Sequence, residues 1–177
     1  RSGTLKHSKR LDLGGSLNPQ DKEALYRTTW TRTQALLEGE QDWIAGMATV
    51  ACEYHTQFPY FHWTGFYRSV EPECLVIGPY QGSHGCTRIA FTQGVCGAAA
   101  RTCETQCVPD VHAFPGHIAC SATTQSEIVV PIVTPAGVLL GVLDVDSDIP
   151  NAFDSVDQAH LEALCNALGA QFAHTAV

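Results

Sequence analysis

The stretch EIVVPIVTPAGVLLGVLDVDS, residues 127–147, decides the fold. It contains two runs of mainly apolar and β-branched residues, Glu127–Thr134 and Val138–Val145, and this composition is typical of buried strands. The segment Pro135-Ala136-Gly137 between the runs predicts a hairpin turn. We therefore expect two antiparallel strands in the middle of a sheet.

Three long helices are expected outside this hairpin. Their apolar residues recur at helical spacing. Asn18 with Pro19 favours the start of the first helix, the second is expected from Asp42, and the last starts near Asp154, which can cap it. The first two are expected to end near Leu37 and Phe58, because glycine or proline follows within two residues.

The middle of the chain alternates between short elements and loops. Two strands joined by a turn are expected at Phe61–Val70 and Cys74–Ile77. An irregular glycine-rich stretch is expected at residues 78–88, a short helix at Gly94–Thr102 and a long loop at Cys107–Gln125. This order of elements is that of an α+β fold, a mostly antiparallel sheet with helices packed against it. Loops of this length usually carry function.

Length and charge limit the class of protein. The 177 residues fit one domain, which we expect over residues 18–177, after a flexible arm at residues 1–17. The net charge is −8, although four of the ten basic residues fall in the first ten positions. The rest of the chain is strongly acidic, which disfavours nucleic-acid binding. No long apolar run and no leader pattern is present, so we expect neither a membrane span nor secretion.

Eight cysteines are many for a chain of this length. They predict a reduced, cytoplasmic protein rather than a disulfide scaffold. Cys52 and Cys165 fall within helical patterns and are expected in the core. Cys86, Cys96 and Cys120 fall in the loop-rich middle, where a nucleophile is a candidate role. Cys96 stands near a helix start, whose dipole is expected to lower the pKa of the thiol.

A zinc site is an alternative interpretation of this region. Thiols and imidazoles are usual zinc ligands, and the region holds Cys103, Cys107, His112, His117 and Cys120. The sequence lacks the tight C-x-x-C pairs of structural zinc sites. We therefore expect neither a metal nor another cofactor, and we interpret His84 and His117 as polar partners of a thiolate.

Four motifs carry a resemblance to a known family. They are WTGFYR, GPYQGSHGCTRIAFTQGVCG, HIACSATTQSEIVVPI and GVLDVDS, at residues 63–68, 78–97, 117–132 and 141–147. Together with Cys86, Cys96 and Cys120, spaced by ten and then twenty-four residues, they resemble the free methionine-(R)-sulfoxide reductases, catalytic members of the GAF-domain family. The resemblance runs from the first helix to the last and implies a GAF-like fold.

The resemblance also implies roles for single residues. Cys120 corresponds to the nucleophile that attacks the sulfoxide sulfur, Cys86 to the resolving thiol and Cys96 to a third family cysteine. Family members have been read with the counterpart of either Cys96 or Cys120 as the attacker, and whether Cys86 or Cys96 resolves the intermediate also stays open. The family's acidic pocket corresponds to Glu127, Asp144 and Asp146, and its aromatic wall corresponds to Trp63 and Tyr67. Free methionine-(R)-sulfoxide is then the substrate and thioredoxin the reductant, and a homodimer through the first and last helices is a further expectation.

The chemistry of these residue types agrees with the resemblance. Asp144 and Asp146 are two apart on a strand, so their side chains share a face. Crowding with Glu127 is expected to raise the pKa of one carboxyl, which leaves a proton donor beside anionic groups that hold an ammonium. Trp63 and Tyr67 are four apart and also share a face. Solvated strand-end contacts and core packing are the alternative explanations.

A non-catalytic GAF-type sensor of a small molecule or of oxidation is the alternative function. It would use the same pocket and thiols, because one fold serves many functions. We expect no output domain or signalling helix beside the core, and this expectation favours the enzyme. The two functions differ in one observable, since a sensor binds its ligand without forming product.

Overall fold

The computed structural model describes residues 17–176. The arm expected over residues 1–17 therefore lies outside the described residues, except for its last position. Within them, no helix is both long enough and apolar enough to cross a membrane.

The three long helices form where the sequence predicts them. They are α1 (Pro19–Leu36), α2 (Trp43–Gln57) and α4 (Ser155–Gln171). The side chains of Asn18 and Asp42 accept hydrogen bonds from main-chain N–H groups in the first turns of α1 and α2. Asp154 does the same for α4 in a capping box with Asp157. These bonds satisfy donors that a helix start leaves free, and this is why the predicted boundaries hold.

A single antiparallel sheet lies beside the helices. Its strands are β1 (Trp63–Glu71), β2 (Cys74–Gln81), β3 (Arg88–Ala90), β4 (Gln106–Val108), β5 (Ser126–Val133) and β6 (Leu139–Ser147), in the spatial order β3-β2-β1-β6-β5-β4. The predicted hairpin joins β5 to β6, and Gly137 adopts a φ of +86° in its turn, a value that glycine tolerates best. The α+β expectation is confirmed.

The loop-rich middle contains more strand than the sequence predicts. β2 continues to Gln81 rather than ending at Ile77, because Tyr80 and Gln81 pair with β1. Short strands β3 and β4 also form, the latter at the start of the expected loop Cys107–Gln125. Strands of three residues are too short to show an alternating pattern, so pairing with a neighbour rather than local composition creates them.

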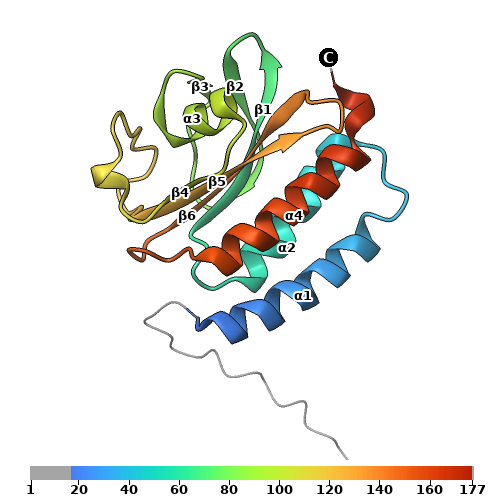
Figure 1. Cartoon of the computed structure of the whole chain (residues 1–177), viewed down its shortest axis with the longest axis horizontal. Helices are drawn as coiled ribbons and strands as arrows, with labels where there is room; N and C mark the ends of the chain where they lie inside the picture. The colour runs from blue at the N-terminus through green and yellow to red at the C-terminus, as the bar shows by residue number, and fades with distance from the viewer. Residues whose placement is uncertain (1–16, 177) are drawn as a thin grey trace, which may run out of the picture.

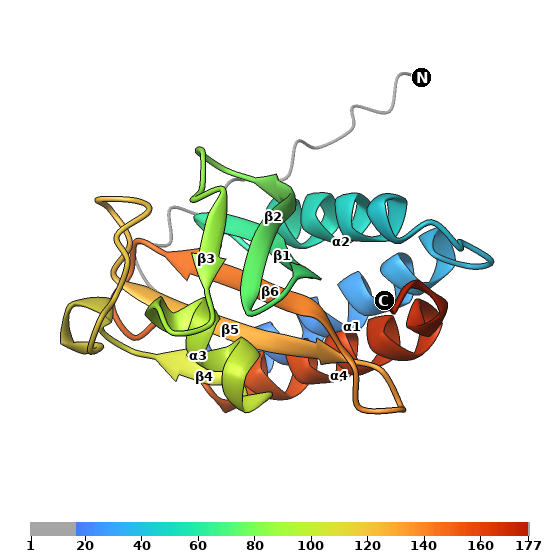
Figure 2. The same cartoon turned by 90° about the horizontal axis from the view of Figure 1, so that it is seen from above.

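The helices form layers on the two faces of the sheet (Figures 1 and 2). α2 and α4 pack on one face, and α1 packs outside them as a further layer. The short helix α3 (Gly94–Thr102) forms as predicted and covers the opposite face. Each face buries its own apolar cluster, so the sheet separates a helical core from a smaller core under α3.

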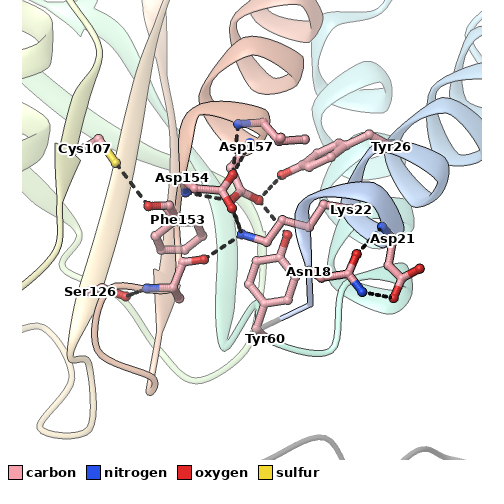
Figure 3. Close-up of polar contacts among 12 residues, drawn as sticks. Asn18, Asp21, Lys22, Tyr26, Tyr60, Cys107, Ser126, Phe153, Asp154 and Asp157 are labelled. Atoms are coloured by element: carbon pink, nitrogen blue, oxygen red, sulfur yellow. Dashed lines mark hydrogen bonds and ion pairs between the residues drawn. The ribbon is translucent and has the colours of Figure 1, made fainter. Parts of the chain in front are cut away.

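A buried polar network links α1 to α4 within the helical layer (Figure 3). The Lys22 ammonium is fully buried and contacts Asp157 closely. It also donates to the Ala152 carbonyl at 2.8 Å. Tyr26 and Tyr60 donate to the Asp157 carboxylate at 2.8 and 2.5 Å. Every buried charge in this network therefore has a partner of opposite charge.

Candidate active site

The register of three strands assembles the floor of a pocket. Asp146 of β6 lies between Trp63 of β1 and Glu127 of β5 in one row across the sheet. Asp144 lies two residues earlier on β6, opposite Gly65. All four side chains line one cavity, as does Tyr67. The predictions that Asp144 and Asp146 share a face, and that Trp63 and Tyr67 do, are confirmed.

Helix α3 packs closely against the end of β3 because of a glycine. A Cβ atom at Gly97 would lie 2.6 Å from the Ala90 carbonyl oxygen, closer than real Cβ contacts allow. This approach brings Cys96 over the sheet, where its side chain is buried. The Cys96 sulfur and one carboxylate oxygen each of Glu127 and Asp144 all lie within 4.8 Å of one another.

The Cys96 thiol has a raised pKa, contrary to the expected effect of the helix dipole. Burial raises the pKa well above its ordinary value, and the negative charges of Asp144 and Glu127 raise it further. Desolvation and these charges therefore outweigh the helix dipole, although Cys96 lies in the first turn of α3 (Gly94–Thr102). These surroundings disfavour an activated thiolate at Cys96.

Two of the three candidate cysteines are joined by a disulfide. Cys86 and Cys120 are bonded across 34 residues of sequence, with Cα atoms 5.7 Å apart. The other six cysteines are free. Cys165 is buried as expected, but Cys52 is exposed. The expectation for Cys52 is wrong because α2 turns Ala51 toward the core and its neighbour toward solvent.

Hydrogen bonds to Trp63 of β1 and to the preceding residue, His62, hold the two loops that carry the disulfide. The indole N–H of Trp63 donates to the Ser83 carbonyl at 2.8 Å, three residues before Cys86. The Nε2 atom of His62 lies 3.1 Å from the Thr123 hydroxyl, three residues after Cys120. Sequence analysis missed His62 in this role. Its place directly before WTGFYR was the available signal.

The carboxyl groups of the floor all have raised pKa values. Burial is the main cause for each of them. Neighbouring negative charges raise the pKa values further. The charge of Asp146 acts on Glu127, the charge of Glu127 acts on Asp144, and the charge of Asp144 acts on Asp146. Crowding thus acts in the predicted direction, but desolvation is the larger effect. The cluster favours retained protons and can supply one.

The pocket has an acidic floor and an aromatic wall. Trp63 stacks between Tyr67 and Tyr80, with ring centroids 5.9 and 5.2 Å away. His84 and His117 also line the pocket, and the Nε2 atom of His117 lies 3.6 Å from a Glu127 oxygen. Among the described residues that line the pocket, none is Lys or Arg. The free volume is about 30 Å³, room for no more than a few water molecules.

The structure does not assemble the zinc site weighed from the sequence. In the described part of the chain, the one group of three potential metal ligands is Cys96, Glu127 and Asp144. Cys103 ends α3 in a left-handed conformation, and Cys107 contacts the Phe153 carbonyl, while Cys120 is in the disulfide. Cys103 and Cys107 therefore lie outside the cavity that His117 and Cys120 line.

Comparisons with known proteins agree on one family. A model of the GAF domain matches residues 44–171. GAF domain-containing protein A of Dictyostelium discoideum is 44% identical over 147 residues, 83% of this chain and 92% of that protein. A free methionine-R-sulfoxide reductase of Saccharomyces cerevisiae is 38% identical over 164 residues, 89% of each chain. The X-ray structure of such a reductase from Neisseria meningitidis, in complex with its substrate, is 40% identical and superposes with a TM-score of 0.82, covering 91% of this chain and 95% of that one.

Proposed function

This chain belongs to the GAF-domain family of free methionine-R-sulfoxide reductases, and from this premise we propose that it reduces free L-methionine-(R)-sulfoxide to methionine, with Cys120 as nucleophile and Cys86 as resolving thiol. The observation that carries the proposal is the Cys86–Cys120 disulfide beside the carboxyl groups of the pocket floor. A sulfoxide reductase needs these two parts, because its product is an oxidised thiol and its substrate oxygen must be protonated.

The reaction moves two electrons from thiols to the sulfoxide. The Cys120 thiolate attacks the sulfur, a protonated carboxyl gives its proton to the oxygen, and methionine leaves while Cys120 keeps the oxygen as a sulfenic acid. The Cys86 thiol then attacks the Cys120 sulfur, so that the disulfide forms and the oxygen leaves as water. An external dithiol returns the two electrons by exchange, and thioredoxin is the proposed donor.

The electrostatics of the floor support both binding and proton transfer. The raised pKa values of Glu127, Asp144 and Asp146 favour a carboxyl that still holds a proton. A carboxylate that has lost its proton attracts the ammonium of a free amino acid. A methionine within a protein chain has no such ammonium, so the acidic floor gives a physical reason for preferring the free substrate.

The thiol pattern supports a reducing compartment, and we propose the cytoplasm. Six of the eight cysteines are free, three of them exposed, which is typical of compartments that keep thiols reduced. Cys86 and Cys120 are half-buried on loops with exposed neighbours, so an external dithiol can approach them. Pairing of two copies through α1 and α4 stays a prediction, which sedimentation of the full chain tests.

The decisive experiment measures product formation from each epimer separately. NADPH oxidation is followed with thioredoxin and thioredoxin reductase, and methionine is quantified in the same samples. We expect turnover with the free R epimer and none with the S epimer. Binding of the R epimer to folded, reduced protein without methionine formation would instead indicate the sensor.

Three cysteine variants then test the roles of the thiols. Cys120→Ser is expected to abolish turnover, because the attacking atom is lost. Cys86→Ser is expected to release one methionine per enzyme and then stop, because the sulfenic acid cannot be resolved. Cys103→Ser removes an exposed thiol outside the pocket and serves as the control with full activity. Multiple turnovers by Cys120→Ser would overturn the assignment.

A further inference from the structure

The Cys96, Glu127 and Asp144 side chains form a cluster that the proposed reaction uses only in part. We propose that this cluster is a binding site for a thiophilic divalent cation, with Zn²⁺ as its representative, in the disulfide form of the protein. One sulfur and two carboxylate oxygens lie within 4.8 Å of one another. Thiolate and carboxylate together suit zinc and its chemical relatives, whereas magnesium and calcium select oxygen alone.

A second observation points to a cation independently of the spacing. Asp144 is 5% exposed, and its Oδ1 atom is buried without a hydrogen-bond partner. A buried carboxylate oxygen without a donor is costly in free energy. None of the described residues lining the pocket offers a lysine or arginine to it. A bound cation would supply the missing positive charge at this oxygen.

The fourth coordination position has a nearby donor. The His117 Nε2 atom is 3.6 Å from a Glu127 oxygen and lines the same cavity. An imidazole nitrogen is a usual zinc ligand. Zinc bonds of about 2.0–2.3 Å in a tetrahedron place ligand atoms roughly 3.3–3.7 Å apart.

The disulfide makes Cys96 the thiol left for a metal in this cavity. Cys86 and Cys120 are bonded to each other, and the space beside Cys96 is about 30 Å³. This space is large enough for an ion. On binding, the thiol and any protonated carboxyl release their protons, a metal–sulfur bond forms, and no electron is transferred. Chelation reverses the reaction.

Cobalt is a suitable probe because its bond to a thiolate absorbs light by charge transfer. The experiment uses the full chain with the Cys86–Cys120 disulfide intact and with the exposed Cys52, Cys103 and Cys107 replaced by serine. We expect one equivalent of Co²⁺ to bind with a charge-transfer band, and Zn²⁺ to displace it. Cys96→Ser should abolish the band, and Asp144→Asn should raise the dissociation constant at least about tenfold. Cys74→Ser, which removes a free thiol outside the cavity, is the matched control and should bind normally.

The outcomes decide the proposal without any measurement of turnover. Absence of the band in the parent protein, or its survival in Cys96→Ser, would overturn the site. If Cys96→Ser fails to fold by circular dichroism, an unchanged affinity in Asp144→Asn would overturn it instead. Because the measurement is direct binding to the oxidised protein, a failure of the reductase proposal leaves this result unaffected.

Discussion

The two faces of the sheet bury acidic groups in opposite ways. On the helical face, Asp157 is fully buried and receives the Lys22 ammonium together with two tyrosine hydroxyls. On the pocket face, Glu127 and Asp144 are buried beside each other, and Asp144 retains an oxygen without a partner. The first cluster is complete within the chain. The second lacks a cation, because none of the described residues that line the pocket is Lys or Arg.

This difference separates a structural role from a binding role. A buried ion pair whose remaining atoms are hydrogen-bonded fixes how two elements dock, and Lys22 does this for α1 and α4. Crowded carboxyl groups without a cation destabilise the fold. Such a cost persists at sites where binding or chemistry requires it. The sequence contains acidic residues in both places, and only the partners distinguish them.

Replacing Lys22 with methionine is expected to cause the largest loss of stability. The substitution leaves Asp157 buried without its cation, and removal of one partner of a buried pair costs about 3–5 kcal/mol. Urea unfolding of the oxidised protein measures the change. Arg27→Met on the same helix is the matched control, because its ion pair with Glu23 is exposed, and it should leave the stability nearly unchanged.

A double variant sharpens this first prediction. Lys22→Met combined with Asp157→Leu removes both charges, so it should recover much of the loss seen in Lys22→Met. If Lys22→Met costs under about 1 kcal/mol, the network does not hold α1 to α4 as the geometry indicates.

Asp144→Asn is expected to change stability in the opposite direction. It removes a crowded carboxyl from the pocket floor, so the free energy of unfolding should rise by about 1–2 kcal/mol. Affinity for the proposed substrate should fall at least tenfold, as roughly 1.4 kcal/mol of attraction to its ammonium is lost. Urea unfolding and the KM measure the two effects. Asp148→Asn, at an exposed neighbour, is the control. Destabilisation by Asp144→Asn would contradict a binding role.

The dependence of stability on pH should differ between the two faces. Burial raises the pKa of Asp144 above its ordinary value, so above that value the folded protein keeps a proton that the unfolded chain has released. Stability contributed by this group therefore falls as pH rises, by at most about 1.4 kcal/mol per pH unit. For Asp154, burial acts upward, but the hydrogen bond and charge of Lys22 leave the pKa lowered. Its contribution is present above the ordinary pKa and is lost as pH falls through the lowered one.

Two variants separate these slopes. Urea unfolding is measured between about pH 3 and pH 8. Asp144→Asn should reduce the decline in the free energy of unfolding above the ordinary pKa of aspartate. Lys22→Met should reduce the decline in the free energy of unfolding as the pH falls on the acid side. The same change of slope in both variants would show that the faces are not electrostatically distinct.

The predictable part of the fold is the part determined by local sequence. Asn18, Asp42 and Asp154 cap their own helices, and the run from residue 127 to residue 147 forms its own hairpin, so these elements appear where expected. The end of β2 and the short β4 depend on pairing with β1 and β5. No local pattern carries such pairing.

The candidate site divides in the same way. Strand alternation correctly places Asp144 with Asp146, because the period of a strand is local. The pKa of Cys96 was predicted in the wrong direction, because it depends on how deeply α3 presses onto the sheet. Likewise, nothing in the surrounding sequence indicates that Lys22 of α1 is buried against Asp157 of α4. Burial is a property of the assembled layers.

The smallest expected effect is the coupling between the two clusters. One chain of contacts joins their neighbourhoods: Lys22 donates to the Ala152 carbonyl, and the Ala152 N–H donates to the hydroxyl of Ser126, which precedes Glu127. The alternation of β5 directs Ser126 and Glu127 to opposite faces of the sheet. The charges of the two clusters therefore interact across the sheet and not through these hydrogen bonds. The stability changes of Lys22→Met and Asp144→Asn should therefore add within about 0.5 kcal/mol in the double variant. The same double-mutant cycle with Asp148→Asn in place of Asp144→Asn is the control, and its coupling energy gives the error of the measurement. A coupling above about 1 kcal/mol would mean that the complete cluster on one face supports the incomplete one on the other.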